Sequence, residues 1–147
     1  MNSIDRAKKR IRNAGIAGVC LIVITVLQSL LPIIGFSPAT IVGFLMHSHL
    51  ETSRVDISHL ANVPLYFFLN LINVLLVVVL TIGIFKKNEL FSILLFSYSI
   101  IALIMVLPTS IGLFGLPIII FLIITVFLFW GIVGTHDYNV LIKRNDH

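Results

Sequence analysis

Residues 64–107 read PLYFFLNLINVLLVVVLTIGIFKKNELFSILLFSYSIIALIMVL, two apolar stretches joined by the polar sequence KKNE at 86–89. Each stretch is about 20 residues long, which is the length that an α-helix needs to cross the hydrocarbon core of a bilayer. Because the connection is short, the two predicted spans, 64–85 and 90–107, form an antiparallel helical hairpin. This hairpin indicates a helical membrane protein.

Two further apolar stretches flank the hairpin, at 14–34 and 116–133. Of all residues 59% are hydrophobic and only 11% are charged, and the mean hydropathy is +1.12. Such a composition leaves too little polar surface to cover a soluble globule of this length. We therefore predict an all-α fold with one integral membrane domain over 1–147, a four-transmembrane-helix bundle with a structured outer loop at 35–62.

The basic residues are placed asymmetrically. All but one of the ten Lys and Arg residues precede the first predicted span, lie in the 86–89 turn or follow the fourth span, and the exception is Arg54. The positive-inside rule then places both termini in the cytoplasm. With a pI of about 9.6, the chain is expected to meet anionic lipid headgroups and not nucleic acid. The predicted location is the bacterial cytoplasmic (inner) membrane, in which the chain is multi-pass.

The two ends of the chain differ from the spans. The segment 3–13 carries apolar residues at helical spacing among basic ones, and we expect it to lie along the cytoplasmic interface. The tail 135–147 is too short to fold alone. At the start of the first span, Ala14 and Gly18 are four residues apart, a spacing that permits close helix approach.

Two short stretches resemble a known group of proteins. They are Arg12, Asn13, Ala14, Ile16, Ala17 and Gly18 in the first span, and Gly83, Ile84, Phe85, Lys86 and Lys87 at the hairpin. At these places the chain is similar to an uncharacterised group of small bacterial four-span membrane proteins. The resemblance implies the four-span fold, and no activity, ligand or catalytic residue carries over from it.

The predicted spans contain no Asp, Glu, Lys, Arg or His in their interior. Ion-coupled transporters and proton relays need such a residue within the membrane, and a di-haem cytochrome needs paired His ligands there. Cys20 is the sole cysteine, so an internal disulfide or a Cys-x-x-Cys relay is excluded. No nucleophile elbow, zinc-protease or phosphate-binding motif is present. We predict a protein that is not an enzyme and has no cofactor.

The outer loop holds the one group of metal-ligand residue types, in the stretch HSHLETSRVDISH. The candidate residues, for contact with a partner or for binding a metal, are His47, His49, Glu51, Asp56 and His59. The outer loop is the one polar surface large enough to recognise a partner, and we expect it to carry the specificity of the protein. On an extended backbone the first two His side chains converge on one divalent metal, and a helix would point them about 200° apart. The interpretation that we favour over metal binding is a solvated loop, in which Asp56 caps a helix and the His side chains lie at the headgroup boundary.

A second polar group lies within the spans. Its candidate residues are Tyr66, Asn70, Asn73 and Ser97, with Ser99 beside the last of them. Asn70 and Asn73 are three residues apart and therefore share a helical face. They line a polar path between helices, or they form interhelical hydrogen bonds that contribute about 1 kcal/mol each. We expect the structural role.

These observations predict a non-enzymatic integral membrane protein that acts by binding a protein or lipid partner, as an accessory subunit or an immunity-type protein. One alternative is a homo-oligomeric small-solute pore or carrier, whose path forms only between protomers. The other is a metal-binding membrane protein that uses the outer loop.

Overall fold

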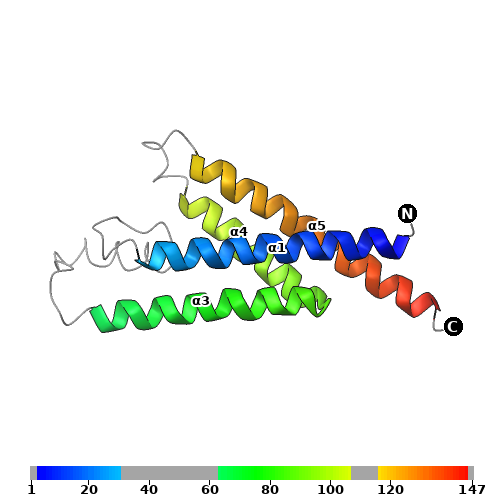
Figure 1. Ribbon diagram of the computed structural model, residues 1–147, viewed down its shortest axis with the longest axis horizontal. Coiled ribbons are helices and arrows are strands. Elements are labelled where there is room, and N and C mark those ends of the chain that lie inside the picture. The colour runs from blue at the N-terminus through cyan, green and yellow to red at the C-terminus, as the bar shows by residue number, and fades with distance from the viewer. Residues whose placement is uncertain (1–2, 31–62, 107–115, 146–147) are drawn as a thin grey trace.

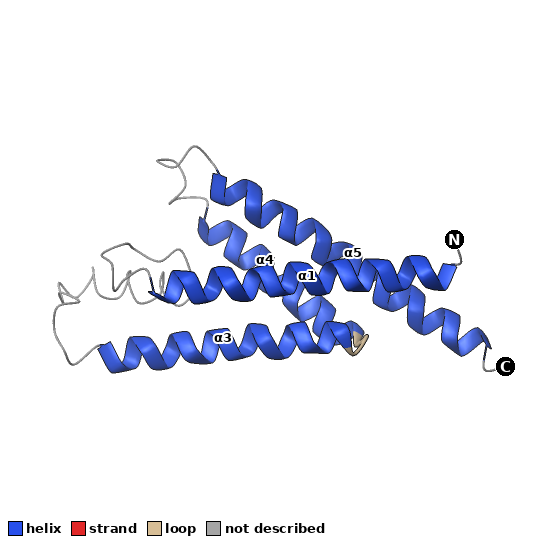
Figure 2. Ribbon diagram, in the orientation of Figure 1, coloured by secondary structure: helices blue, strands red, loops and turns tan. Residues whose placement is uncertain are grey.

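The computed structural model describes residues 3–30, 63–106 and 116–145, which form four α-helices and the turn between two of them (Figures 1 and 2). The helices are α1 (Ser3–Leu30), α3 (Val63–Phe85), α4 (Glu89–Val106) and α5 (Leu116–Asn145). No strand occurs in these ranges, and all four helices are long and apolar enough to cross a membrane. For the described residues, this confirms the prediction of an all-α protein with four helices of membrane-spanning length. The outer loop 35–62 lies outside the described residues.

The four helices pack as a ring of antiparallel neighbours. The main contacts join α1 to α3 and α5, and α4 to α3 and α5, so that every helix has two neighbours. The short turn after α3 makes α3 and α4 a helical hairpin, as its length predicts (Figure 1). Because α1 and α5 are also in contact, the first and last helices close the ring.

Each helix buries one narrow stripe of residues, spaced alternately three and four apart. The stripe positions are Ala7, Ile11, Ala14, Gly18, Leu21 and Thr25 on α1, Asn70, Asn73, Val77, Leu80 and Ile84 on α3, Ser92, Leu95, Ser99, Ala102 and Val106 on α4, and Phe121, Ile124, Leu128, Gly131 and Thr135 on α5. Beside the stripes, Gly15, Ala17, Thr81, Gly83 and Gly134 are also buried. This spacing averages 3.5 residues and keeps one face of each helix turned towards its neighbours. In the apolar part of each helix the other faces carry large exposed hydrophobic side chains, which is the pattern of a surface covered by lipid.

Small residues in these stripes bring the helix backbones close together. A Cβ atom built on Gly131 would lie 2.4 Å from the Cβ of Ala14, so α5 and α1 approach closely at this level. On the next turn of α1, a Cβ atom built on Gly18 would lie 2.7 Å from Thr81 Oγ1 of α3. The predicted close approach at Ala14 and Gly18 is confirmed, and the two residues serve two different helix pairs.

The start of the chain differs from its prediction. The segment 3–13, expected to lie along the cytoplasmic interface, is the beginning of a continuous α1. The tail 135–147, predicted to be too short to fold alone, is helical as a continuation of α5 as far as Asn145. At 1.5 Å per residue, these two helices are about 42 and 45 Å long, and the hydrocarbon core measures about 30 Å.

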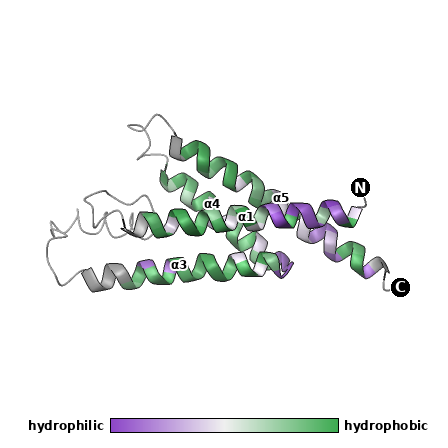
Figure 3. Cartoon of the chain, viewed as in Figure 1, coloured by the Kyte–Doolittle hydropathy of each residue, from purple (hydrophilic) through white to green (hydrophobic). Residues whose placement is uncertain are grey.

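The extended ends pack against their neighbours. Gly134 of α5 lies against Ala7 and Arg10 of α1, and Thr135 bonds to Ser92 of α4. Ala7 is 1% exposed and Thr135 is fully buried, although both lie beyond the predicted spans. The polar residues of the two ends gather on the side of the molecule where the turn between α3 and α4 also lies (Figure 3). We call this region, formed by 3–13, 86–89 and 134–143, the charged end.

Candidate functional site

An ion pair joins the first and last helices at the charged end. Arg10 Nη1 donates a hydrogen bond of 2.8 Å to Asp137 Oδ2, and the guanidinium carbon of Arg10 lies 5.0 Å from the centroid of the Trp130 ring. About a third of the Arg10 side chain and two fifths of the Asp137 side chain remain exposed, so solvent weakens the attraction. The arrangement fixes the position of the Arg10 guanidinium between a carboxylate and an aromatic face.

Two further contacts attach the end of α5 to the α3–α4 hairpin. Lys87 Nζ donates a hydrogen bond of 2.6 Å to Tyr138 Oη and lies 4.1 Å from the centroid of the same ring. His136 Nδ1 lies 3.1 Å from Glu89 Oε1, and this pair is more exposed. The C-terminal part of α5 is therefore held from two sides, by α1 and by the turn.

The backbone of the turn explains why Lys87 is available for this contact. The N–H of Asn88 donates to the carbonyl of Gly83 at 3.1 Å, and the N–H of Lys87 donates to that of Ile84 at 2.8 Å. These are the two bonds of a Schellman motif, in which the residue after the helix adopts a left-handed conformation. Lys87 occupies that position with a φ of 61°, where glycine is usual. Asn88 then caps α4, because its Oδ1 accepts the N–H of Leu90 at 3.0 Å.

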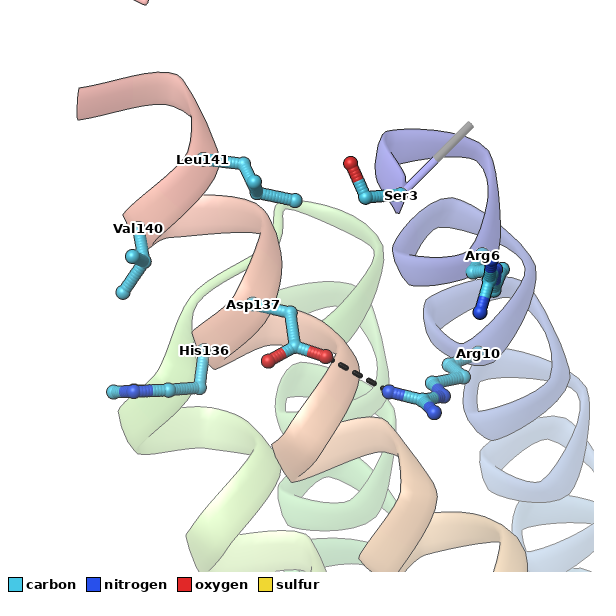
Figure 4. Close-up of a pocket in the computed structure, with 7 residues that line it drawn as sticks. All are labelled: Ser3, Arg6, Arg10, His136, Asp137, Val140 and Leu141. Atoms are coloured by element: carbon cyan, nitrogen blue, oxygen red, sulfur yellow. Dashed lines mark hydrogen bonds and ion pairs between the residues drawn. The ribbon is translucent and has the colours of Figure 1, made fainter. Parts of the chain in front are cut away.

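An open pocket of about 420 Å³ lies between the ends of α1 and α5 (Figure 4). Its lining residues are Ser3, Arg6, Arg10, His136, Asp137, Val140 and Leu141. Figure 4 shows the ion pair between Arg10 and Asp137 in the pocket, with Val140 and Leu141 on the side of α5. The lining offers two cations, one carboxylate and an apolar wall, which suits a polar ligand that also carries an apolar part.

A second open pocket, of about 300 Å³, adjoins the first and shares Arg6 and Arg10 with it. Its other lining residues are Lys9, Asn13, Phe127 and Trp130. This pocket lies where the basic start of α1 meets the apolar part of α5.

The predicted polar face inside the spans is assembled in part. Asn70 and Asn73 are both buried on α3, at 2% and 5% exposure. Tyr98 Oη on α4 donates a hydrogen bond of 3.0 Å to Asn73 Oδ1 and also bonds to the Thr25 side chain on α1. Three helices thus share one buried polar cluster, although Asn73 Nδ2 is buried without a partner among the described residues.

Two other members of the predicted face do not join this cluster. The Ser97 side chain is exposed on α4, so its grouping with the Asn residues is wrong. The neighbouring Ser99 faces inward and bonds to Thr125 of α5, with 2.5 Å between the hydroxyl oxygens. Tyr66 belongs to α3 by its backbone, and its side chain falls outside the described part of the chain.

The outer-loop candidates His47, His49, Glu51, Asp56 and His59 also fall outside the described ranges. Their predicted roles, in contact with a partner or as ligands of a divalent metal, therefore stay predictions. Within 3–30, 63–106 and 116–145, no group of three or more His, Cys, Asp or Glu residues lies close enough to hold a metal ion.

The charged-end residues Arg10, Lys87, Asp137 and Tyr138 were not among the predicted site residues. The spacing of the buried stripes could have indicated them, because it continues beyond the predicted spans. On α1 the three-and-four pattern begins at Ala7, well before the predicted span, and on α5 the step from Thr135 to Tyr138 continues it beyond the fourth span. Such continuity predicts helices that extend past the membrane.

Comparison of the chain with protein families, with curated proteins and with solved structures finds no match. The resemblance to small bacterial four-span proteins stays a prediction.

Proposed function

We propose that this chain is a non-enzymatic protein of the bacterial cytoplasmic membrane that acts by binding a protein or lipid partner, with both termini in the cytoplasm. The observation that carries the proposal is the contrast between its interior and its charged end. The buried stripes are filled by small and apolar side chains and by hydroxyl and amide groups, with no ionisable carboxylate, amine or imidazole among the described buried residues. The charged end, in contrast, offers exposed cations and an open pocket.

The orientation rests on the distribution of charge. The start of α1, the turn at 86–89 and the end of α5 carry all but one of the ten Lys and Arg residues, and they lie on one side of the molecule (Figure 3). Moving several such residues across a bilayer costs a few kcal/mol each. In a bacterial cytoplasmic membrane this side faces the cytoplasm, where a partner of the charged end is to be found.

Single-cysteine labelling tests the orientation, in a chain whose native Cys20 has been replaced by Ala. Cysteines at positions 2 and 146 are expected to resist a membrane-impermeant reagent in intact cells, and a cysteine at position 52 is expected to react. Labelling of both termini from outside would contradict the proposal.

Site-specific photo-crosslinking in cells tests partner binding. A photoreactive amino acid at Val140, which is exposed and lines the pocket at the charged end, is expected to capture one protein or lipid species reproducibly. The matched control is Val79, which is exposed on α3 within the apolar span. If both positions capture only bulk membrane lipid, the charged end is not a partner site.

A second candidate function is a homo-oligomeric pore or carrier for small solutes. The observation that favours it is Ser97, a hydroxyl exposed in the middle of an otherwise apolar helix face. In an oligomer this face would be buried between protomers and would offer a polar contact. Solution mass in detergent separates the two candidates, because a pore of this kind requires several copies and the partner-binding protein does not.

A further inference from the structure

The pocket lined by Arg6, Lys9, Arg10, Asn13, Phe127 and Trp130 combines two unlike surfaces. α1 supplies the polar side, and its residues lie on one face because they are spaced three or four apart. α5 supplies the aromatic side, from two residues that are three apart. We call this the interfacial pocket.

The polar side carries an excess of positive charge. Three basic side chains line the interfacial pocket and no acidic side chain does. Arg6 and Lys9 form no ion pair or hydrogen bond with any residue in the described part of the chain, whereas Arg10 is fixed by Asp137 and Trp130. A fixed guanidinium beside two unpaired cations suits a phosphate group, because guanidinium donors match the geometry of phosphate oxygens.

The aromatic side leads directly to the apolar surface of the helices. Phe127 and Trp130 are 42% and 45% exposed. One turn further along the same faces lie Ile123 on α5 and Ile16 on α1, and both are about half exposed. A ligand in the interfacial pocket therefore meets cations at one end and a continuous apolar surface at the other.

We propose that the interfacial pocket binds one anionic phospholipid of the cytoplasmic leaflet, with its phosphate beside Arg6, Lys9 and Arg10 and an acyl chain along Phe127. This inference rests on the orientation given under the proposed function. A free phosphate shares the headgroup chemistry, but it leaves the aromatic side unused. Basic pockets at the cytoplasmic ends of membrane helices bind anionic headgroups by this division of contacts.

Trp130 makes the test direct, because it is the sole tryptophan of the chain and lines the pocket. The protein is reconstituted in bilayers that mix phosphatidylcholine with phosphatidylglycerol, and one of the two lipids carries brominated acyl chains that quench Trp fluorescence. The quenching curves give the relative affinity of the two lipids for the surroundings of Trp130. We expect phosphatidylglycerol to be preferred by at least about fivefold, the factor that one basic residue near an anionic surface contributes.

Two double variants separate a specific site from diffuse attraction. The variant R6Q/K9Q removes two cations from the interfacial pocket, and K8Q/R12Q removes two exposed cations from other faces of the same helix. Both lower the net charge equally. The first is expected to abolish the preference for phosphatidylglycerol, and the second to retain it.

Three outcomes would overturn the inference: no preference in the unaltered protein, an equal loss in both variants, or equal displacement of the brominated lipid by inorganic phosphate. The last would identify a soluble anion as the ligand. A protein partner that is still captured at Val140 in any of these cases would leave the proposed function intact. The two proposals therefore fail separately.

Discussion

Arg10 and Asp137 are joined by a hydrogen bond of 2.8 Å although 127 residues separate them in the chain. The contact links the two helix ends at the charged end, the start of α1 and the end of α5, beyond the predicted limits of the membrane spans. It also places the Arg10 guanidinium over Trp130, between the two pockets of the charged end.

The ion pair is expected to contribute modestly to stability. In a double-mutant cycle of R10Q and D137N, measured by unfolding in detergent, we expect a coupling free energy of about 0.5 kcal/mol, because the pair is partly exposed. R10Q should cost more than D137N, since it also removes the contact with Trp130, which contributes about 0.5–1 kcal/mol. Equal costs for the two single variants would show that the Trp130 contact contributes nothing.

The contact between α1 and α5 is expected to be intolerant of added methyl groups. A Cβ on Gly134 would lie 2.8 Å from the Arg10 Cβ and 3.2 Å from backbone atoms of Ala7 and Ile11, so the helices themselves must move. We expect Gly131→Ala and Gly134→Ala each to lower the free energy of unfolding by about 1–3 kcal/mol.

Gly15→Ala provides the matched control for the glycine variants. The three atoms nearest to its Cβ would all belong to the ring of Phe85, which is half exposed and can rotate away. This variant should lose less stability than either of the α5 variants. If all three lose the same amount, backbone approach between α1 and α5 is not the limiting feature.

The buried Asn73 is expected to act as a structural contact between helices. Asn73→Leu removes the bond from Tyr98 and should lower stability by about 1 kcal/mol, with function falling only as folded protein falls. Ser97→Ala, at the exposed position on α4, should change stability little. An Asn73→Leu protein that keeps its melting temperature and loses all activity would favour the pore or carrier.

At Lys87, we expect the side-chain contact with Tyr138 to offset the cost of the left-handed backbone conformation. Its left-handed conformation costs about 1 kcal/mol relative to glycine, and its ammonium binds Tyr138. Lys87→Gly should therefore stabilise a Tyr138→Leu protein by about 1 kcal/mol and the unaltered protein by clearly less. Both changes are measured by unfolding in detergent. If Lys87→Gly raises the free energy of unfolding equally in the unaltered and the Tyr138→Leu protein, the Lys87–Tyr138 contact does not contribute to stability.

The sequence alone determined the class of the fold and the number of its membrane-crossing helices. Runs of about 20 apolar residues leave the backbone no hydrogen-bonding partner in lipid except its own helix, so each run specifies a helix without reference to the others. The short KKNE turn likewise determined the α3–α4 hairpin locally, because few residues can connect only antiparallel neighbours. The spacing of Asn70 and Asn73 also predicted that they share one face of the helix.

Only the tertiary structure decided where α1 begins, where α5 ends and which residues form the charged end. The segments 3–13 and 134–145 are too polar to be stabilised by the membrane alone. The first packs against α5, and the second packs against α1 and against the turn between α3 and α4. The partners Arg10 and Asp137 are related by no local spacing, since their contact depends on which helices of the ring are neighbours. The burial of Ser99 and the exposure of Ser97 were likewise decided by the tertiary structure. They lie two residues apart on one helix, and only packing against α5 decides which of them is buried.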